Sequence, residues 1–106
     1  MQFQIQDVGD LLISFEGLIG LQVITSEAEI IGQVKGANID TKSWQTTELY
    51  VKLSNATAEK LGMKKRLGSP TVCIPVSVVQ AVGNLVSLSK SMKDLANSGE
   101  ITECKE

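Results

Sequence analysis

Alternation of apolar and polar residues is clearest in the middle of the chain, at residues 44–53. The alternating side chains form an apolar set and a polar set: Leu49, Val51 and Leu53, and Glu48, Tyr50 and Lys52. A period of two residues places successive side chains on opposite faces of an extended strand. The segment is therefore predicted to be a strand whose apolar set faces the core.

The preceding segment, Ile30–Asp40, also alternates, but its phase changes partway along. The two phases are occupied first by Ile30, Gly32, Val34 and Gly36, and then by Ala37 and Ile39. A slip of one residue at Gly36 reconciles the phases, which is the effect of a β-bulge. Because bulges bend and coil sheets, this segment predicts a barrel-like sheet, and the two strands together predict a β-hairpin.

Shorter elements are predicted on both sides of this hairpin. They are, in chain order, a strand at 21–25, a polar turn at 26–29, a helix at 54–61, a strand at 71–74, a 3₁₀ or α-helical turn carrying Val76, Val79 and Val82, a strand at 85–89 and a helical turn at 91–96. Ser54 or Asn55 is suited to cap the helix at 54–61. Gly62 and Gly99 are suited to end helices in the left-handed conformation. Residues 100–106 are predicted to be frayed.

The order of these elements predicts the fold class. No connection is long enough for the helix-bearing crossovers that usually join parallel strands. We therefore expect a mainly β protein, a small antiparallel barrel of about five to six strands with one or two short helices. The chain then divides into an N-terminal arm with a short amphipathic helix at 1–19, the barrel at 20–96 and a flexible tail at 97–106.

Apolar residues of the N-terminal arm recur at helical spacing, namely Val8, Leu11, Leu12 and Phe15. This stripe has three interpretations. It can cover the open side of the barrel, which we favour, it can dock on a second chain, or it can lie on a membrane. The membrane is the least favoured, because the arm carries Asp7, Asp10 and Glu16 but no Lys or Arg.

The amino-acid composition argues against several classes of function. The 106 residues are 42% hydrophobic and 21% charged, as in a globular domain. The net charge of -2 argues against general affinity for DNA, which requires many Lys and Arg. Histidine, the usual general base and the commonest metal ligand, is absent from the sequence. We therefore expect no catalysis, no cofactor and no metal ion.

Two cysteines, Cys73 and Cys104, lie far apart and outside any CxxC motif, which makes a zinc site improbable. The presence of two cysteines allows a Cys73–Cys104 disulfide, but nothing in the sequence indicates secretion. Cys73 lies in an apolar run, where a free thiol behaves as a small hydrophobic residue. With no signal-peptide pattern and no apolar run long enough to cross a bilayer, we expect a cytoplasmic protein without an integral membrane segment.

Two pairs of residues suggest chemistry at first sight. Gly32 and Gly36 lie inside a strand, whereas a phosphate-binding loop needs its glycines between a strand and a helix. We therefore favour a bulge and close packing. Asp40 and Glu48 have no predicted apolar cleft of the kind that an acid–base pair requires. Asp40 is better suited to cap the hairpin turn.

The remaining candidates are binding residues. A basic cluster can contact RNA or an acidic partner, although a solvated loop is favoured: Lys60, Lys64, Lys65 and Arg66. Trp44 either caps the open end of the barrel or is an exposed anchor, since interface hot spots favour Trp, Tyr and Arg. Tyr50 can belong to the same surface. The predicted partner-binding residues are Leu11, Leu12, Phe15, Trp44 and Tyr50.

A series of short motifs recurs in a characteristic order. The motifs are Gly20-Leu21-Gln22-Val23-Ile24, Glu29-Ile30-Ile31-Gly32-Gln33-Val34, Ile39-Asp40, Glu48-Leu49-Tyr50-Val51, residues 57–61, Val72-Cys73-Ile74-Pro75-Val76 and Ala81-Val82-Gly83-Asn84-Leu85-Val86-Ser87-Leu88. In order and spacing they resemble the PRC-barrel domain family, in particular its short stand-alone archaeal members. The resemblance covers residues 20–95. Asn84 stands where Asp is usual, and the N-terminal arm lies outside the family pattern.

The PRC-barrel resemblance implies a function. The family includes the cytoplasmic domain of the photosynthetic reaction-centre H subunit, the C-terminal domain of the ribosome maturation factor RimM, and archaeal proteins linked to FtsZ-based cell division. The size of this chain is similar to the third group. The resemblance therefore implies a non-catalytic, dimeric adaptor that binds itself, a paralogous PRC-barrel chain or cell-division proteins. The alternative is a ribosome- or RNA-associated maturation factor similar to the RimM domain.

Overall fold

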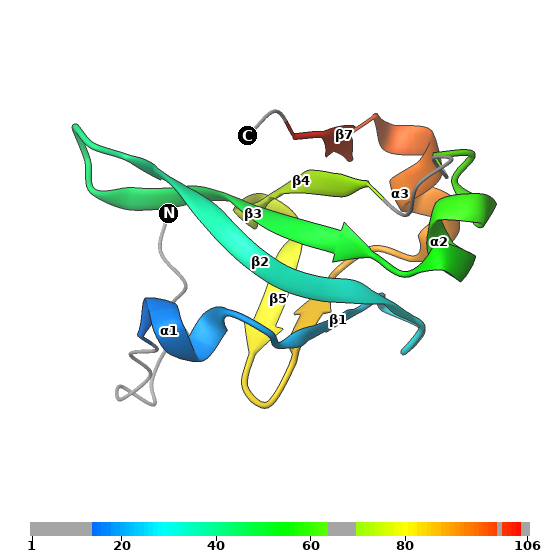
Figure 1. The fold of residues 1–106 in the computed structure, drawn as a ribbon, viewed down its shortest axis with the longest axis horizontal. Helices are drawn as coiled ribbons and strands as arrows, with labels where there is room; N and C mark the ends of the chain where they lie inside the picture. The colour runs from blue at the N-terminus through cyan, green and yellow to red at the C-terminus, as the bar shows by residue number, and fades with distance from the viewer. Residues whose placement is uncertain (1–13, 64–69, 100, 105–106) are drawn as a thin grey trace.

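The computed structural model describes residues 14–63, 70–99 and 101–104. Its elements, in chain order, are α1 (Phe15–Leu18), β1 (Gln22–Ile24), β2 (Ile30–Asp40), β3 (Gln45–Leu53), α2 (Asn55–Lys60), β4 (Thr71–Pro75), the 3₁₀ helix η1 (Val76–Val78), β5 (Val79–Val82), β6 (Val86–Leu88), α3 (Met92–Ser98) and β7 (Thr102–Glu103) (Figure 1). The sequence-predicted strands at β1, β2, β3, β4 and β6 are all confirmed, with small shifts at their ends.

Within the described residues the strands form one sheet in the order β5-β6-β1-β2-β3-β4-β7. All neighbours pair antiparallel except β1 and β6, which run parallel. The sheet curls, so that β5 crosses β3 and β4 steeply (Figure 1). The mainly β class is confirmed. The expected count of five to six strands and the purely antiparallel pairing are wrong, because the described part holds seven strands in a mixed sheet with three α-helices.

The β2–β3 hairpin contains the predicted bulge, one residue before the expected position at Gly36. Val34 pairs with Val51 and Gly36 pairs with Tyr50, so Lys35 is the extra residue of a bulge. Leu49 and Val51 are fully buried, which confirms the apolar face of β3. The phase at the start of β2 differs from the prediction: Ile31 is buried and Ile30 is 52% exposed. A second register shift, between β1 and β2, reverses the alternation there.

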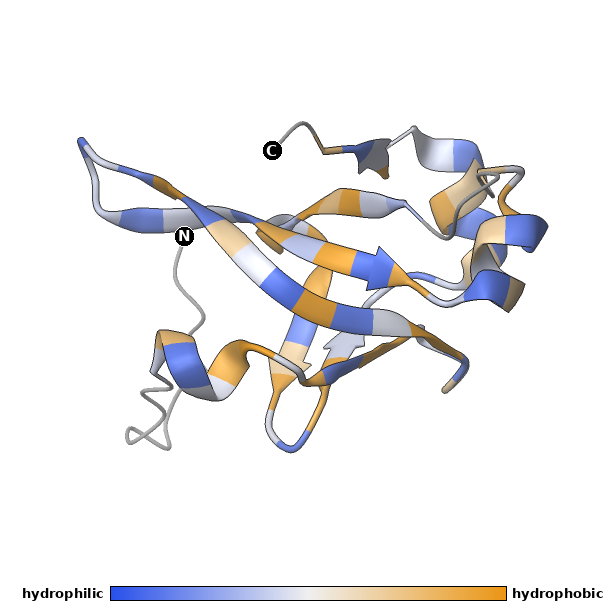
Figure 2. Ribbon diagram, viewed as in Figure 1, coloured by the Kyte–Doolittle hydropathy of each residue, from blue (hydrophilic) through white to orange (hydrophobic). Residues whose placement is uncertain are grey.

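The core lies on the inner face of the curled sheet. Its fully buried strand residues include Val23, Ile31, Val34, Leu49, Val51, Val72, Ile74, Val86 and Leu88. Each α-helix contributes one apolar residue to this core: Leu18 from α1, Ala58 from α2 and Leu95 from α3. Figure 2 shows the apolar residues recurring along β2, β3 and β4. Among the described residues, no buried side-chain nitrogen or oxygen lacks a hydrogen-bond partner.

Serine residues begin all three α-helices. Ser14, Ser54 and Ser91 each accept a hydrogen bond from the backbone N–H three residues later. The caps predicted at the other ends are confirmed, because Gly62 and Gly99 have φ of 70° and 73°. The first described helix begins only at Phe15. Val8, Leu11 and Leu12 of the predicted amphipathic stripe lie outside the described residues.

The C-terminal segment differs most from the prediction. Residues 102 and 103, expected to be frayed, form β7 on the edge of β4, and the Cys104 N–H donates to the Thr71 carbonyl. A disulfide joins Cys73 of β4 to Cys104, so the expectation of a free thiol at Cys73 is wrong. Residues 79–82, assigned from their spacing to a helical turn, form β5 after η1. The β7 pairing and the disulfide depend on partners remote in sequence, which local periodicity does not encode, whereas β5 pairs with the next strand, β6, across a short turn.

Candidate functional site

The β2–β3 hairpin extends beyond the rest of the sheet. β3 pairs with β4 only between Glu48 and Lys52, so within the described residues the last part of the hairpin has no third strand. The apolar stripe on the inner face of β2 continues into this extension. It passes from the buried Val34 to the half-buried Ala37 and then to Ile39, which is 47% exposed. The core of the protein therefore reaches the surface at this end.

The hairpin turn holds Trp44 in an unusual conformation. The Asp40 carboxylate accepts the Lys42 N–H at 2.8 Å, and the Asp40 carbonyl accepts the Trp44 N–H at 2.6 Å. This confirms Asp40 as the cap of the turn. Trp44 has φ of 57°, in a region that is costly for a residue with a side chain, and its side chain is 74% exposed. The alternative in which Trp44 closes the end of the barrel is therefore wrong.

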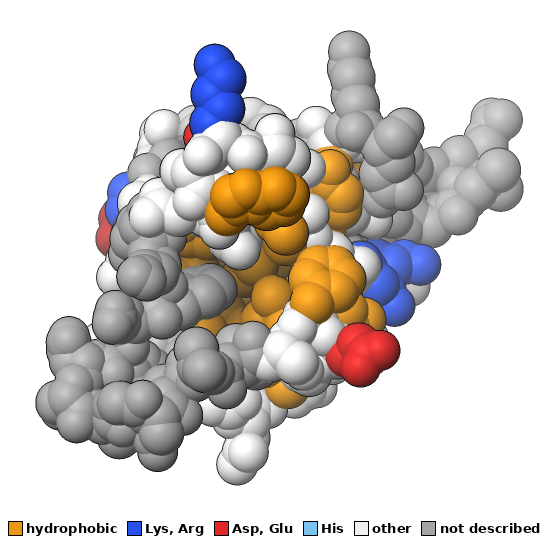
Figure 3. Space-filling view, turned by 90° about the vertical axis from the view of Figure 1, so that its left-hand side faces the viewer, with side chains coloured by type: hydrophobic (Ala, Val, Ile, Leu, Met, Phe, Trp, Pro, Cys, Tyr) orange, Lys and Arg blue, Asp and Glu red, His pale blue; other side chains and the backbone are white. Residues whose placement is uncertain are grey.

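Helix α1 lies at the same end of the molecule. Leu18 fixes it to the core, whereas Phe15, on its first turn, is 53% exposed. Seen from this end, apolar side chains gather over the hairpin and over α1, with a hollow between them (Figure 3). We call Phe15, Ile39 and Trp44 the open-end surface. Of the predicted partner-binding residues, Phe15 and Trp44 belong to it, and Leu11 and Leu12 lie outside the described residues.

Tyr50 lies on a different face. It points away from the core, is half-buried, and donates a hydrogen bond from its hydroxyl to Asn38 Oδ1 at 2.6 Å. Asn38 in turn donates from Nδ2 to Glu48 Oε1 at 2.9 Å. This chain of hydrogen bonds fixes the Tyr50 ring across the outer face of the hairpin. Tyr50 therefore lies on the outer face of the hairpin, and a surface shared by Tyr50 and Trp44 stays a prediction.

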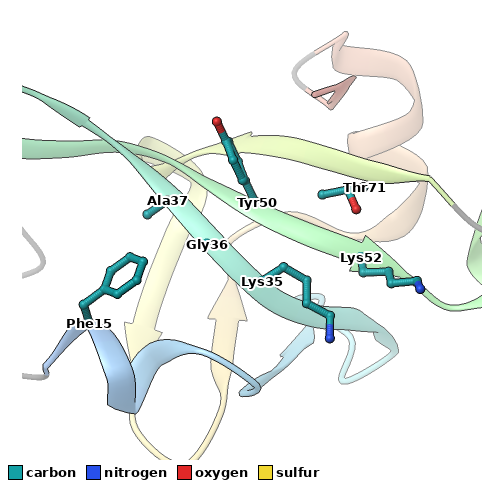
Figure 4. Close-up of a pocket in the computed structure, with 7 residues that line it drawn as sticks. All are labelled: Phe15, Lys35, Gly36, Ala37, Tyr50, Lys52 and Thr71. Atoms are coloured by element: carbon teal, nitrogen blue, oxygen red, sulfur yellow. The ribbon is translucent and has the colours of Figure 1, made fainter. Parts of the chain in front are cut away.

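A shallow hollow of about 540 Å³ adjoins Tyr50 on the outer face (Figure 4). Its lining residues come from α1, β2, β3 and β4: Phe15, Lys35, Gly36, Ala37, Tyr50, Lys52 and Thr71. Sequence reasoning missed this site. The sequence contained one signal for this site. The bulge at Lys35 and the position of Lys52 in the polar set of β3 both place a cation on the outer face.

The other sequence candidates are engaged locally. The carboxylates of Asp40 and Glu48 each accept a hydrogen bond within the hairpin. Lys60 forms an ion pair with Glu29 at 2.7 Å, and the other members of the basic cluster, Lys64, Lys65 and Arg66, lie outside the described residues. Across the described ranges, no group of three or more acidic, cysteine or histidine residues is placed to hold a metal ion. In the same ranges, no helix is both long and apolar enough to cross a membrane.

Comparisons with known proteins add no further identification: no protein-family model and no curated protein matches the sequence.

Proposed function

We propose that this protein is a non-catalytic interaction module that associates with a second copy of itself through the open-end surface. The observation that carries the proposal is the exposure of Phe15, Ile39 and Trp44, by 53%, 47% and 74%, at one end of the molecule. Large apolar side chains grouped at one place on a surface are typical of protein interfaces. Tryptophan in particular is enriched among the residues that dominate binding energy.

Backbone strain supports a functional role for Trp44. A tryptophan at φ of 57° costs free energy that a glycine or asparagine would avoid. Backbone strain of this kind is concentrated at functional sites, where it contributes to the mechanism. The strained turn presents the indole ring to solvent, where a partner can bury it.

A second copy of this chain suits the open end because the surface is continuous with the core. Ile39 extends the inner-face stripe that is buried at Val34, so a symmetric partner can complete the core on both sides at once. Closed two-fold dimers are the commonest oligomers, and they use the same patch on both chains.

The resemblance to PRC-barrel proteins supports a biological setting for this association. In that setting the protein is a cytoplasmic adaptor that helps to assemble archaeal FtsZ-based division machinery, with a paralogous PRC-barrel chain as a further partner. The Cys73–Cys104 disulfide is compatible with a cytoplasmic location in one group of organisms, since intracellular proteins of hyperthermophilic archaea are rich in disulfides.

The test is sedimentation velocity over a concentration series from nanomolar to high micromolar. We expect a reversible dimer in the micromolar range, and the double variant Ile39→Thr/Trp44→Ser should weaken it at least about tenfold, as loss of a hot-spot residue does. Ile30→Thr is the matched control, because Ile30 lies on the same strand at the opposite end and is 52% exposed. A wild-type protein that remains monomeric throughout, or a dimer equally weakened by Ile30→Thr, contradicts the proposal.

A further inference from the structure

The outer face carries a second surface with different chemistry from the open end. The hollow of about 540 Å³ around Gly36 is bordered by outward residues of the hairpin, by Ala37 and by Phe15 of α1 (Figure 4). Its volume is within the range of ordinary ligand sites, but it is shallow and open, which suits a segment of another chain better than an enclosed small molecule.

The hollow exists because of the bulge and the glycine within it. Gly36 is opposite Tyr50, and a Cβ atom added to Gly36 would lie 3.2 Å from Tyr50 Cδ2. A larger side chain at this position would fill the hollow and press on the tyrosine ring. The ring cannot easily move aside, because its hydroxyl is held by Asn38. The wall of the hollow is therefore formed before any ligand arrives.

Two cations border the hollow. Lys35 is the bulged residue of β2, and Lys52 projects from the outer face of β3. Both are exposed, and neither has an acidic partner among the described residues. The outward acidic residue of β3, Glu48, is engaged by the Asn38 amide instead. The site thus offers positive charge that nothing in the described part of the chain neutralises.

Aromatic and polar groups complete the site. Phe15 reaches the hollow from α1 and is 53% exposed, and the Tyr50 ring lies on the other side (Figure 4). Thr71, at the start of β4, adds a hydroxyl beside Lys52. One ligand can therefore place an apolar group against Phe15 and Tyr50 and a carboxylate against Lys35 and Lys52.

We propose that the hollow around Gly36 binds an acidic peptide segment of a partner protein, with a carboxylate between Lys35 and Lys52 and an apolar side chain against Phe15 and Tyr50. The choice of an acidic peptide follows from the charge of the site and from its shallow shape. This site shares Phe15 with the open-end surface, but neither Trp44 nor Ile39 lines the hollow, so the two proposals can be tested apart through those two residues.

The experiment measures fluorescence anisotropy of a labelled peptide of alternating aspartate and leucine, against peptides in which serine replaces aspartate or leucine. We expect the aspartate–leucine peptide to bind most tightly and to weaken as salt is added. Lys35→Glu/Lys52→Glu should reduce its affinity at least about tenfold, since each change replaces an attraction by a repulsion. Gly36→Val, which fills the hollow, should reduce it by a similar factor without altering the charge.

Three controls make the result decisive. Lys42→Glu makes the same charge change at an exposed site on the hairpin turn and should leave peptide affinity within about twofold of wild type. Trp44→Ser should lower dimerisation but not peptide binding, which separates the two proposals. Thermal melts identify any variant that fails to fold. Equal binding of all three peptides, equal losses for Lys42→Glu and Lys35→Glu/Lys52→Glu, or binding of a labelled single-stranded RNA in place of the peptide overturns the inference.

Discussion

The two ends of the curled sheet differ in whether their apolar surface is covered. At one end lie α2 and α3 (Figure 1), and Ala58 and Leu95 bury apolar surface that the strands leave uncovered. We call this the helix end. At the other end the hairpin extends past β4, and Phe15, Ile39 and Trp44 remain exposed. The same kind of apolar stripe is covered within the chain at the helix end and left for a partner at the open end.

The sheet edges show the same contrast. The edge of β4 is covered by β7, a strand of two residues that is tied down by the Cys73–Cys104 disulfide. The last part of β2, past Val34, pairs only with β3 among the described residues. An unpaired edge beside exposed apolar residues is a surface that another chain can use. The covered end therefore contributes to stability, whereas the open end is available for interaction. Substitutions at each end can test this difference.

The largest effect is expected from removing a buried side chain at the helix end. Leu95→Ala should lower the free energy of unfolding by about 2–5 kcal/mol, because it leaves a cavity where the side chain was 1% exposed. Ile39→Ala at the open end should cost less than about 1 kcal/mol, since nearly half of its surface already faces water. Urea unfolding monitored by circular dichroism, at a concentration where the protein is monomeric, measures both values. Equal losses would remove the distinction between the two ends.

The next largest effect is expected at the edge of the sheet where the disulfide joins Cys73 to Cys104. Replacing both cysteines, by Cys73→Ala and Cys104→Ser, should lower the free energy of unfolding by about 2–4 kcal/mol, because the disulfide closes a long loop between residues 31 positions apart. Hydrogen exchange should also accelerate at the amide of residue 104, which donates to the Thr71 carbonyl, since a two-residue strand has little stability of its own. Reduction of the wild-type protein should reproduce both changes. Unchanged stability and exchange would mean that β7 holds to β4 without the covalent link.

The smallest effect on stability is expected at the hairpin turn. Trp44→Gly should leave the free energy of unfolding within about 1 kcal/mol of wild type, because the relief of the positive φ offsets the added chain entropy of glycine. Dimerisation should nevertheless fall as it does for Trp44→Ser. Thermal melts and sedimentation of the same sample measure the two properties. A loss of more than about 3 kcal/mol would show that the indole ring is part of the folded core, as is typical for a buried Trp.

The sequence could predict the site only in part. The exposure of Trp44 was one of two open interpretations, and the partner role of Phe15 depended on a stripe of which only Phe15 itself is described. For Tyr50, periodicity predicted the face of the strand but not the hydrogen bonds across it. Tyr50 points outward as predicted, yet its hydroxyl is bound to Asn38 on the neighbouring strand. The lysine-bordered hollow required the register of β2 against β3, which places Lys35 and Lys52 on the border of the same hollow.

By itself, the sequence determined most of the elements that are set by neighbouring residues, although it missed β5. Period-two alternation predicted β2 and β3, the phase change predicted a bulge within one residue of its position at Lys35, and a serine and a glycine bounded α2. Only the tertiary structure decided the parallel pairing of β1 with β6, the addition of β7 to β4 and the disulfide between Cys73 and Cys104. Such contacts join segments far apart in the chain, and their free energy comes from the completed sheet and core rather than from any local pattern.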